Sequence, residues 1–83
     1  MTTERVTRYV EEDPLRPGPS HARLVKAGVE IWALVGYYQH AAGGDSERVA
    51  HDYAVPTEAV QAALDYYRRY RKLIDAQIAR NAA

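Results

Sequence analysis

The most informative segment of this 83-residue chain reads Val49-Ala50-His51-Asp52-Tyr53-Ala54-Val55-Pro56-Thr57-Glu58-Ala59-Val60-Gln61-Ala62-Ala63-Leu64. Its apolar spacing predicts a helix-turn-helix, in which two helices cross at a tight three-residue corner. The Val-Ala pair that opens the segment seats the first helix on the second, and Val55 fills the corner. Val60, Ala63 and Leu64 give the second helix its inward stripe. Motifs of this spacing commonly place their second helix in the major groove of DNA.

One further helix is predicted before this segment. The residues on its inner face, with Trp32 at the edge, are Ile31, Leu34, Val35 and Tyr38. Gly43-Gly44 ends this helix, and Asp45 is placed to cap the next one. Pro56 closes the corner, and Thr57 is placed to cap the last helix. Together these elements predict an all-α protein with a three-helix core.

The last helix has no breaker after Thr57 and is predicted to continue to about Arg80. Its apolar or aromatic positions, with Arg71 as an interruption, are Leu64, Tyr67, Ile74 and Ile78. A helix of this length extends past a small three-helix core. The part beyond Tyr67 then carries an apolar stripe with nothing of its own chain to cover it, which predicts a partner or a homodimer.

The first twenty residues are predicted to form an arm and a linker rather than part of the core. Loose alternation over residues 2–10 favours a short extended segment. Three prolines then make residues 13–20 a linker. Around Lys26-Ala27-Gly28, either a very small hairpin or a frayed helical turn is possible. We therefore expect an N-terminal arm and linker over residues 1–20 and a helix-turn-helix domain over residues 21–83.

Composition limits the classes of function. The formal net charge is zero and there is no cysteine, so the strong basic excess of free nucleic-acid binders is absent and neither a disulfide nor a thiolate metal site can form. Without a basic apolar leader or an uncharged run long enough for a bilayer, we expect a soluble cytoplasmic protein. His21, His40 and His51 lack metal-ligand spacing, and no phosphate-binding or nucleophile motif occurs. We expect neither an enzyme nor a cofactor.

Two sets of residues are candidates for contacts with a partner. The DNA-facing start of the last helix would present Thr57, Glu58, Gln61, Ala62 and Asp65. Of these, Thr57 and Gln61 suit DNA contacts, with Arg68 and Arg69 further along, whereas the two carboxylates would repel a polyanion. Arginine and tyrosine are enriched at protein interfaces. The predicted protein-binding residues are Tyr67, Arg68, Tyr70, Arg71, Ile74, Ile78 and Arg80.

Three segments of the chain together resemble a known bacterial family. They are Val29-Glu30-Ile31-Trp32-Ala33-Leu34-Val35, Gly44-Asp45-Ser46-Glu47-Arg48-Val49-Ala50-His51-Asp52-Tyr53 and Val60-Gln61-Ala62-Ala63-Leu64-Asp65-Tyr66-Tyr67. Their order is similar to the family called domain of unknown function four-three-three, and the resemblance covers roughly residues 22–78. Family members often carry a Gly-Thr-Arg element where this chain reads Ala27-Gly28-Val29, so no role of that arginine transfers.

The resemblance implies a homeodomain-like helical protein that acts as an antitoxin similar to the VapB type. Such a protein blocks a toxin in a stoichiometric complex. The toxin implied is a PIN-domain ribonuclease, with a nucleotidyltransferase as the other possibility. Either the acidic run Glu11-Glu12-Asp13 or the arginines of the last helix would engage it. The alternative function is a transcriptional repressor that binds its own operator DNA.

Overall fold

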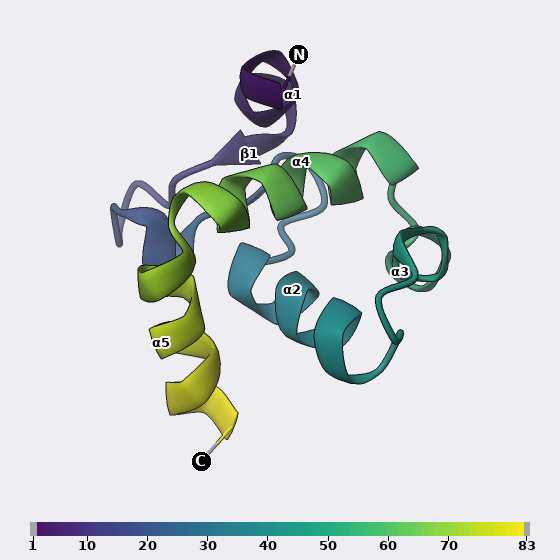
Figure 1. Ribbon diagram of the computed structural model, residues 1–83. Coiled ribbons are helices and arrows are strands. Elements are labelled where there is room, and N and C mark those ends of the chain that lie inside the picture. Colours follow the sequence, from purple (N-terminus) through teal and green to yellow (C-terminus); the bar gives the residue numbers. More distant parts are fainter. Residues whose placement is uncertain (1, 83) are drawn as a thin grey trace.

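The protein is mostly helical, with a small sheet beside the helices. The computed structural model describes the backbone of residues 2–82 and the side chains of residues 4–82. Residues 1 and 83, the outer ends of the two predicted segments, lie outside this range. The elements within it are α1 (Thr2–Tyr9), β1 (Val10–Glu11), the 3-10 helix η1 (Pro19–His21), β2 (Arg23–Leu24), α2 (Ile31–His40), α3 (Ser46–Tyr53), α4 (Thr57–Arg69) and α5 (Arg71–Ala82) (Figure 1). The all-α expectation is right at this coarse level, because most of the described residues are helical. It did not include the short antiparallel pair of β1 and β2.

The helix α2 begins and buries its inner face where the sequence predicted. Ile31, Leu34 and Val35 are fully buried, and Tyr38 is half-buried. After α2 the chain reverses through Gly43 and Gly44, whose φ values are 61° and 81°. Glycine adopts this left-handed conformation at little cost, because it has no Cβ. The reversal places the start of α3 beside the end of α2.

Asp45 caps α3, as predicted. Its carboxylate accepts hydrogen bonds from the N–H groups of Glu47 and Arg48 at 3.1 and 3.2 Å, two donors that the first turn of a helix leaves without a partner. The prediction for Thr57 is wrong, because this residue is the first of α4 and does not cap it. Pro56 occupies the cap position, with no side-chain hydrogen bond.

The predicted corner between α3 and α4 is present at residues 54–56. Ala54 adopts a left-handed conformation, with φ 56° and ψ 47°. Val55 is half-buried and packs against the core. The residues expected to join the two helices are all buried, namely Val49, Ala50, Val60, Ala63 and Leu64. The inward stripe of α4 is therefore confirmed.

The predicted extended N-terminal arm is instead the helix α1, followed by the short strand β1. Figure 1 shows α1 on the opposite side of α4 from α2, and α1 packs directly on α4. Val6 is buried there, and Arg5 forms an ion pair with Asp65 at 2.7 Å. These contacts span about sixty residues of sequence, so the local pattern did not reveal them. Residues 2–11 thus belong to the folded body.

The remaining part of the linker is irregular, as predicted, apart from the short η1. Beyond it, the chain makes a minimal hairpin around Lys26, one of the two alternatives left open by the sequence. Arg23 pairs opposite Glu30, and the N–H of Leu24 donates to the carbonyl of Val29 at 2.7 Å. On its other side β2 pairs antiparallel with β1, with Leu24 opposite Val10. This pairing ties the N-terminal segment to the domain.

The predicted continuous C-terminal helix is wrong, because the chain bends at Tyr70. α4 ends at Arg69, Tyr70 has φ −121° and ψ 39°, and α5 turns back against α2 and η1 (Figure 1). A single helix from Thr57 to Arg80 would be about 36 Å long, whereas the longest dimension of the described chain is 29 Å. The bend buries Ile74 completely and leaves Ile78 half-buried. The chain therefore covers most of its own apolar stripe.

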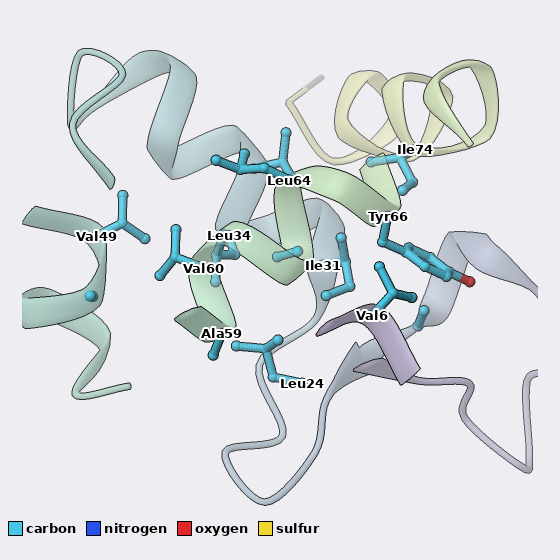
Figure 2. Close-up of a cluster of buried hydrophobic side chains, with 14 of the residues drawn as sticks. Val6, Leu24, Ile31, Leu34, Val49, Ala59, Val60, Leu64, Tyr66 and Ile74 are labelled. Atoms are coloured by element: carbon cyan, nitrogen blue, oxygen red, sulfur yellow. The ribbon is translucent and has the colours of Figure 1, made fainter. Parts of the chain in front are cut away.

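The core is continuous from α3 to α5. In Figure 2, Val49 and Val60 lie at one end, Leu34 and Ile31 in the middle, and Ile74 at the other end. The ring of Tyr66 lies between Ile74 and Val6 of α1. All five helices contribute to one cluster of buried side chains.

Candidate functional site

The face of α4 that would enter a DNA groove is covered by α1. Ala62, one of the residues expected to point outward, has no exposed surface. Asp65 is paired with Arg5 at 2.7 Å and with Arg68 at 2.9 Å, and its side chain is only 7% exposed. Glu58 accepts a hydrogen bond from the Tyr9 hydroxyl at 3.0 Å. The helix α1 thus lies where the groove would have to be.

The two residues expected to touch DNA have different surroundings. Thr57 is exposed at the start of α4. Gln61 is half-buried and donates a hydrogen bond to the Ser46 hydroxyl at 3.1 Å, which ties α4 to α3. Gln61 is therefore already engaged within the chain. The structure does not bring these two residues together with Arg68 and Arg69, which lie at the far end of α4.

A basic surface forms where α4 bends into α5. We call it the basic bend, and it comprises Arg68, Arg69, Tyr70, Arg71, Lys72 and Leu73 around a shallow hollow of about 370 Å³. Four of its six side chains are cations. Leu73 is 48% exposed, which makes it one of the two large apolar side chains that the described chain leaves in solvent. The basic bend therefore combines positive charge with accessible apolar surface.

The charges of the basic bend are only partly compensated. Arg68 is paired with Asp65, and the Arg71 guanidinium lies 5.5 Å from the centre of the Tyr67 ring. Arg69 and Lys72 have no hydrogen-bond or ion-pair partner within the described residues. Arg71 and Lys72 also lie in the first turn of α5, where the helix dipole is itself positive. The basic bend therefore has an excess of positive charge and suits a negatively charged group.

The Tyr67 hydroxyl connects three helices beside the basic bend. Its hydroxyl donates to Asp75 Oδ1 at 2.8 Å and accepts from Gln39 Nε2 at 3.3 Å, which links α4, α5 and α2. Burial, together with the hydrogen bond to Asp75, raises the pKa of Tyr67 above the usual value for tyrosine. This side chain is a structural tie that keeps the two helices at their angle.

The predicted protein-binding residues divide into two groups. Tyr67, Arg68, Tyr70 and Arg71 lie at or beside the basic bend. Ile74, Ile78 and Arg80 do not. Ile74 is fully buried in the chain's own core, so its expected exposure is wrong. Arg80 donates a hydrogen bond to the Gln77 side chain one turn earlier in α5. Ile74 is buried because the bend at Tyr70 turns the face of α5 that carries it toward the core.

A second, larger hollow was not foreseen from the sequence. It has a volume of about 550 Å³ and lies between the end of α1, the Lys26 turn and the corner before α4. Its lining residues are Arg8, Tyr9, Leu24, Val25, Lys26, Ala27, Ala54, Val55, Pro56 and Ala59. They come from separate segments that only the tertiary fold brings together. No local motif could have identified this hollow.

Polar groups elsewhere join helices rather than form a recognisable centre. On α3, Asp52 accepts a hydrogen bond from the Tyr37 hydroxyl at 2.5 Å, and this bond lowers the pKa of Asp52. His51 lies beside it but is almost entirely exposed. Residues 2–82 contain no group of three or more histidine, aspartate or glutamate side chains able to hold a metal ion. No helix in the same range is both long and apolar enough to cross a membrane.

No family model, no curated protein and no solved structure matches this chain. The resemblance described above therefore stays a prediction that rests on the quoted segments.

Proposed function

We propose that this protein is a cytoplasmic antitoxin that neutralises a toxin by direct binding through the basic bend. In this proposal α2, α3 and α4 form a homeodomain-like unit, and α1 and α5 close it on either side. The observation that carries the proposal is the uncompensated positive charge of Arg69 and Lys72 beside the exposed Leu73. A surface of this composition favours an acidic, partly apolar partner.

The charge of the basic bend suits the carboxylates of a metal-dependent toxin. Metal-dependent ribonucleases gather carboxylates around the ions that activate water or stabilise phosphate. Arginine pairs with such carboxylates in a bidentate geometry, which gives both strength and orientation. A nucleotidyltransferase also carries carboxylates for its metal ions, and both classes accept a substrate with several phosphates, so the basic bend suits either active site. We propose the PIN-type ribonuclease because it is the toxin that the resemblance implies first.

The acidic run offers less support for a role in inhibition. Glu11 is paired with Arg23 at 2.9 Å, and Asp13 is paired with Arg16 at 3.3 Å. These carboxylates contribute to holding the N-terminal segment in place. Of the two ends that the sequence left open, the C-terminal half has the larger uncompensated charge.

Co-purification with the product of the adjacent reading frame tests the proposal. The variant is Arg69→Glu combined with Lys72→Glu, because both side chains are free of partners within the described chain and their replacement should spare the fold. We expect binding to the ribonuclease to weaken by at least about tenfold and its RNA cleavage to return. Arg8→Glu on α1 is the matched control, since it reverses an exposed charge that also has no partner within the described residues and lies away from the basic bend.

Two results would count against the proposal. One is the absence of a nuclease or transferase among the products of adjacent reading frames. The other is unchanged inhibition by the double variant in the presence of normal circular dichroism. In the second case, the toxin would have to be bound by another surface.

Operator binding is the competing proposal, and the position of α1 argues against it. Base reading by α4 would require α1 to leave, which breaks the Arg5–Asp65 ion pair and exposes Val6. The arginines of the basic bend could still contact phosphates. A salt titration of the binding of the isolated protein to the upstream promoter DNA separates the two proposals. Affinity through several phosphates falls steeply with salt concentration and would support operator binding, whereas no measurable binding to this DNA favours neutralisation alone.

A further inference from the structure

A loop between β1 and η1 displays a leucine. Leu15 is 90% exposed, the highest value among the large apolar side chains of the described residues. It lies between Pro14 and Pro17, whose rings restrict the backbone on both sides. Burial of a leucine side chain removes apolar surface from water and is favourable, so a partner that covers Leu15 gains affinity. We call residues 12–18 the Leu15 loop.

The Leu15 loop is held rigidly by its own polar groups. Asp13 is largely buried, its Oδ1 accepts from the N–H of Leu15 at 2.9 Å, and its Oδ2 accepts from Arg16 Nε at 3.3 Å. The Asp13 carbonyl accepts from the N–H of Arg16 at 3.1 Å, and Glu12 accepts from the N–H of Gly18 at 3.1 Å. A loop ordered in this way loses little entropy when its tip is bound. Such pre-organisation is typical of an anchor side chain.

The 550 Å³ hollow has the matching chemistry. We call it the Lys26 hollow. Leu24 and Ala59 form a buried apolar floor, while Arg8 and Lys26 contribute two cations that have no hydrogen-bond or ion-pair partner within the described residues. Its volume falls in the range of sites that bury small ligands, so it can receive a leucine side chain. Lys26 is held at φ 72°, a backbone conformation that lysine rarely adopts.

The charges of the two surfaces are complementary. Glu11 at the end of β1 is paired with Arg23, and Asp13 in the loop is paired with Arg16, whereas the loop residue Glu12 has no cationic partner in the described chain. The loop thus offers an apolar anchor beside a carboxylate without a cationic partner, and the hollow offers an apolar floor beside two cations without an anionic partner. The hollow is lined by other segments of the chain and by none of the loop residues, so the loop of the same molecule does not fill it.

We propose that the Leu15 loop of one copy docks into the Lys26 hollow of a second copy, and that two such reciprocal contacts make a homodimer. Leu15 lies on the apolar floor, and Glu12 pairs with Arg8 or Lys26. A twofold arrangement uses both surfaces of each copy and stops at two chains. The basic bend contributes no residue to this interface. Dimerisation and toxin binding are therefore separable.

Sedimentation velocity over a concentration series from micromolar to millimolar tests this dimer with the full chain. We expect a concentration-dependent dimer, and Leu15→Asp should raise its dissociation constant roughly tenfold or more. Circular dichroism should be unchanged, because the side chain makes no buried contact. Leu73→Asp is the matched control, since it places the same charge at the other exposed leucine and should leave self-association intact.

A mixing experiment makes the test specific to these two surfaces. The combination of Arg8→Glu and Lys26→Asn removes both cations from the hollow and should also weaken self-association. Mixed with Leu15→Asp, it should associate more tightly than either variant alone, because one loop and one hollow remain intact. A chain that stays monomeric at millimolar concentration, a dimer insensitive to Leu15→Asp, or a mixture without restored association would each overturn the proposal.

Discussion

The bend at Tyr70 makes a quantitative prediction for Ile74. If α5 folds back as described, Ile74→Ala removes three buried carbon atoms from the core. If instead the helix were continuous, the same residue would lie in solvent and its truncation would cost almost nothing. Ile74 has no exposed surface, so the two cases differ by the full value of a core truncation. One substitution therefore distinguishes a folded-back α5 from a projecting one.

The size of the effect follows from the burial of Ile74. Each buried methylene contributes about 0.8 kcal/mol, and the cavity left between α2, α4 and α5 adds to the loss. We expect Ile74→Ala to lower the free energy of unfolding by about 3 kcal/mol. A domain of this length has a total of only about 4–12 kcal/mol. The midpoint of thermal unfolding should fall by about 12–24 °C.

Urea unfolding followed by circular dichroism measures this loss. The midpoint should move to lower urea while the slope stays near that of the wild type. Leu73→Ala, one residue away on the exposed side of α5, is the control and should change stability by less than about 0.5 kcal/mol. Equal, small effects of both substitutions would refute the burial of Ile74 and restore the projecting helix.

Three further predictions concern a cap, a buried hydroxyl and the docking of α1. Asp45→Ala should lower stability by about 1 kcal/mol in urea unfolding, because the start of α3 loses its two side-chain hydrogen bonds, whereas Asp45→Asn should retain most of it. Burial raises the pKa of Tyr66 to about 12 from the usual 10.0, so the folded state holds this proton more tightly and the wild type loses stability as the pH rises from 10 to about 12. Tyr66→Phe should be as stable as the wild type or more stable at neutral pH, and it should lose less stability than the wild type in alkaline urea titrations. Arg5→Ala should speed amide hydrogen exchange in α1 by roughly tenfold with little change in α2, and equal exchange in both proteins would show that the ion pair with Asp65 does not hold α1.

The local features of the fold were predictable from sequence. The cap at Asp45, the corner at Val55 and the buried face that starts at Ile31 each depend on neighbours within a few residues. Their rules are those of helix capping and of apolar periodicity. The same reasoning located the buried stripe of α4, because Val60 and Leu64 face the core whatever packs outside them.

The features that were missed depend on distant contacts. α1 has Val6 as its one buried apolar side chain, so its pattern carries little helical information, and it is held by α4 some sixty residues later. Tyr70 ends α4 without glycine or proline. The centre of the Tyr70 ring lies 4.8 Å from the centre of the Tyr66 ring, and the bend buries Ile74. Tertiary burial overrode the continuous helical pattern there.

The basic bend was foreseen in composition but not in shape. Arg68 and Arg71 were expected to share a surface along a straight helix, and the bend gathers them with Lys72 around one hollow. The Lys26 hollow was not foreseen at all, because its cations lie on α1 and on a turn eighteen residues later. Surface sites built from several segments need the tertiary arrangement before they can be recognised.

The position of α1 changes what an N-terminal truncation would do. Removing α1 uncovers a strip of α4 that carries Ala62 flanked by Glu58 and Asp65. This exposed surface would be apolar and acidic rather than basic. A trimmed molecule would thus be prone to aggregate and would repel nucleic acid. The helix α1 is thus an integral part of the folded chain, and affinity tags are better attached at the C-terminal end.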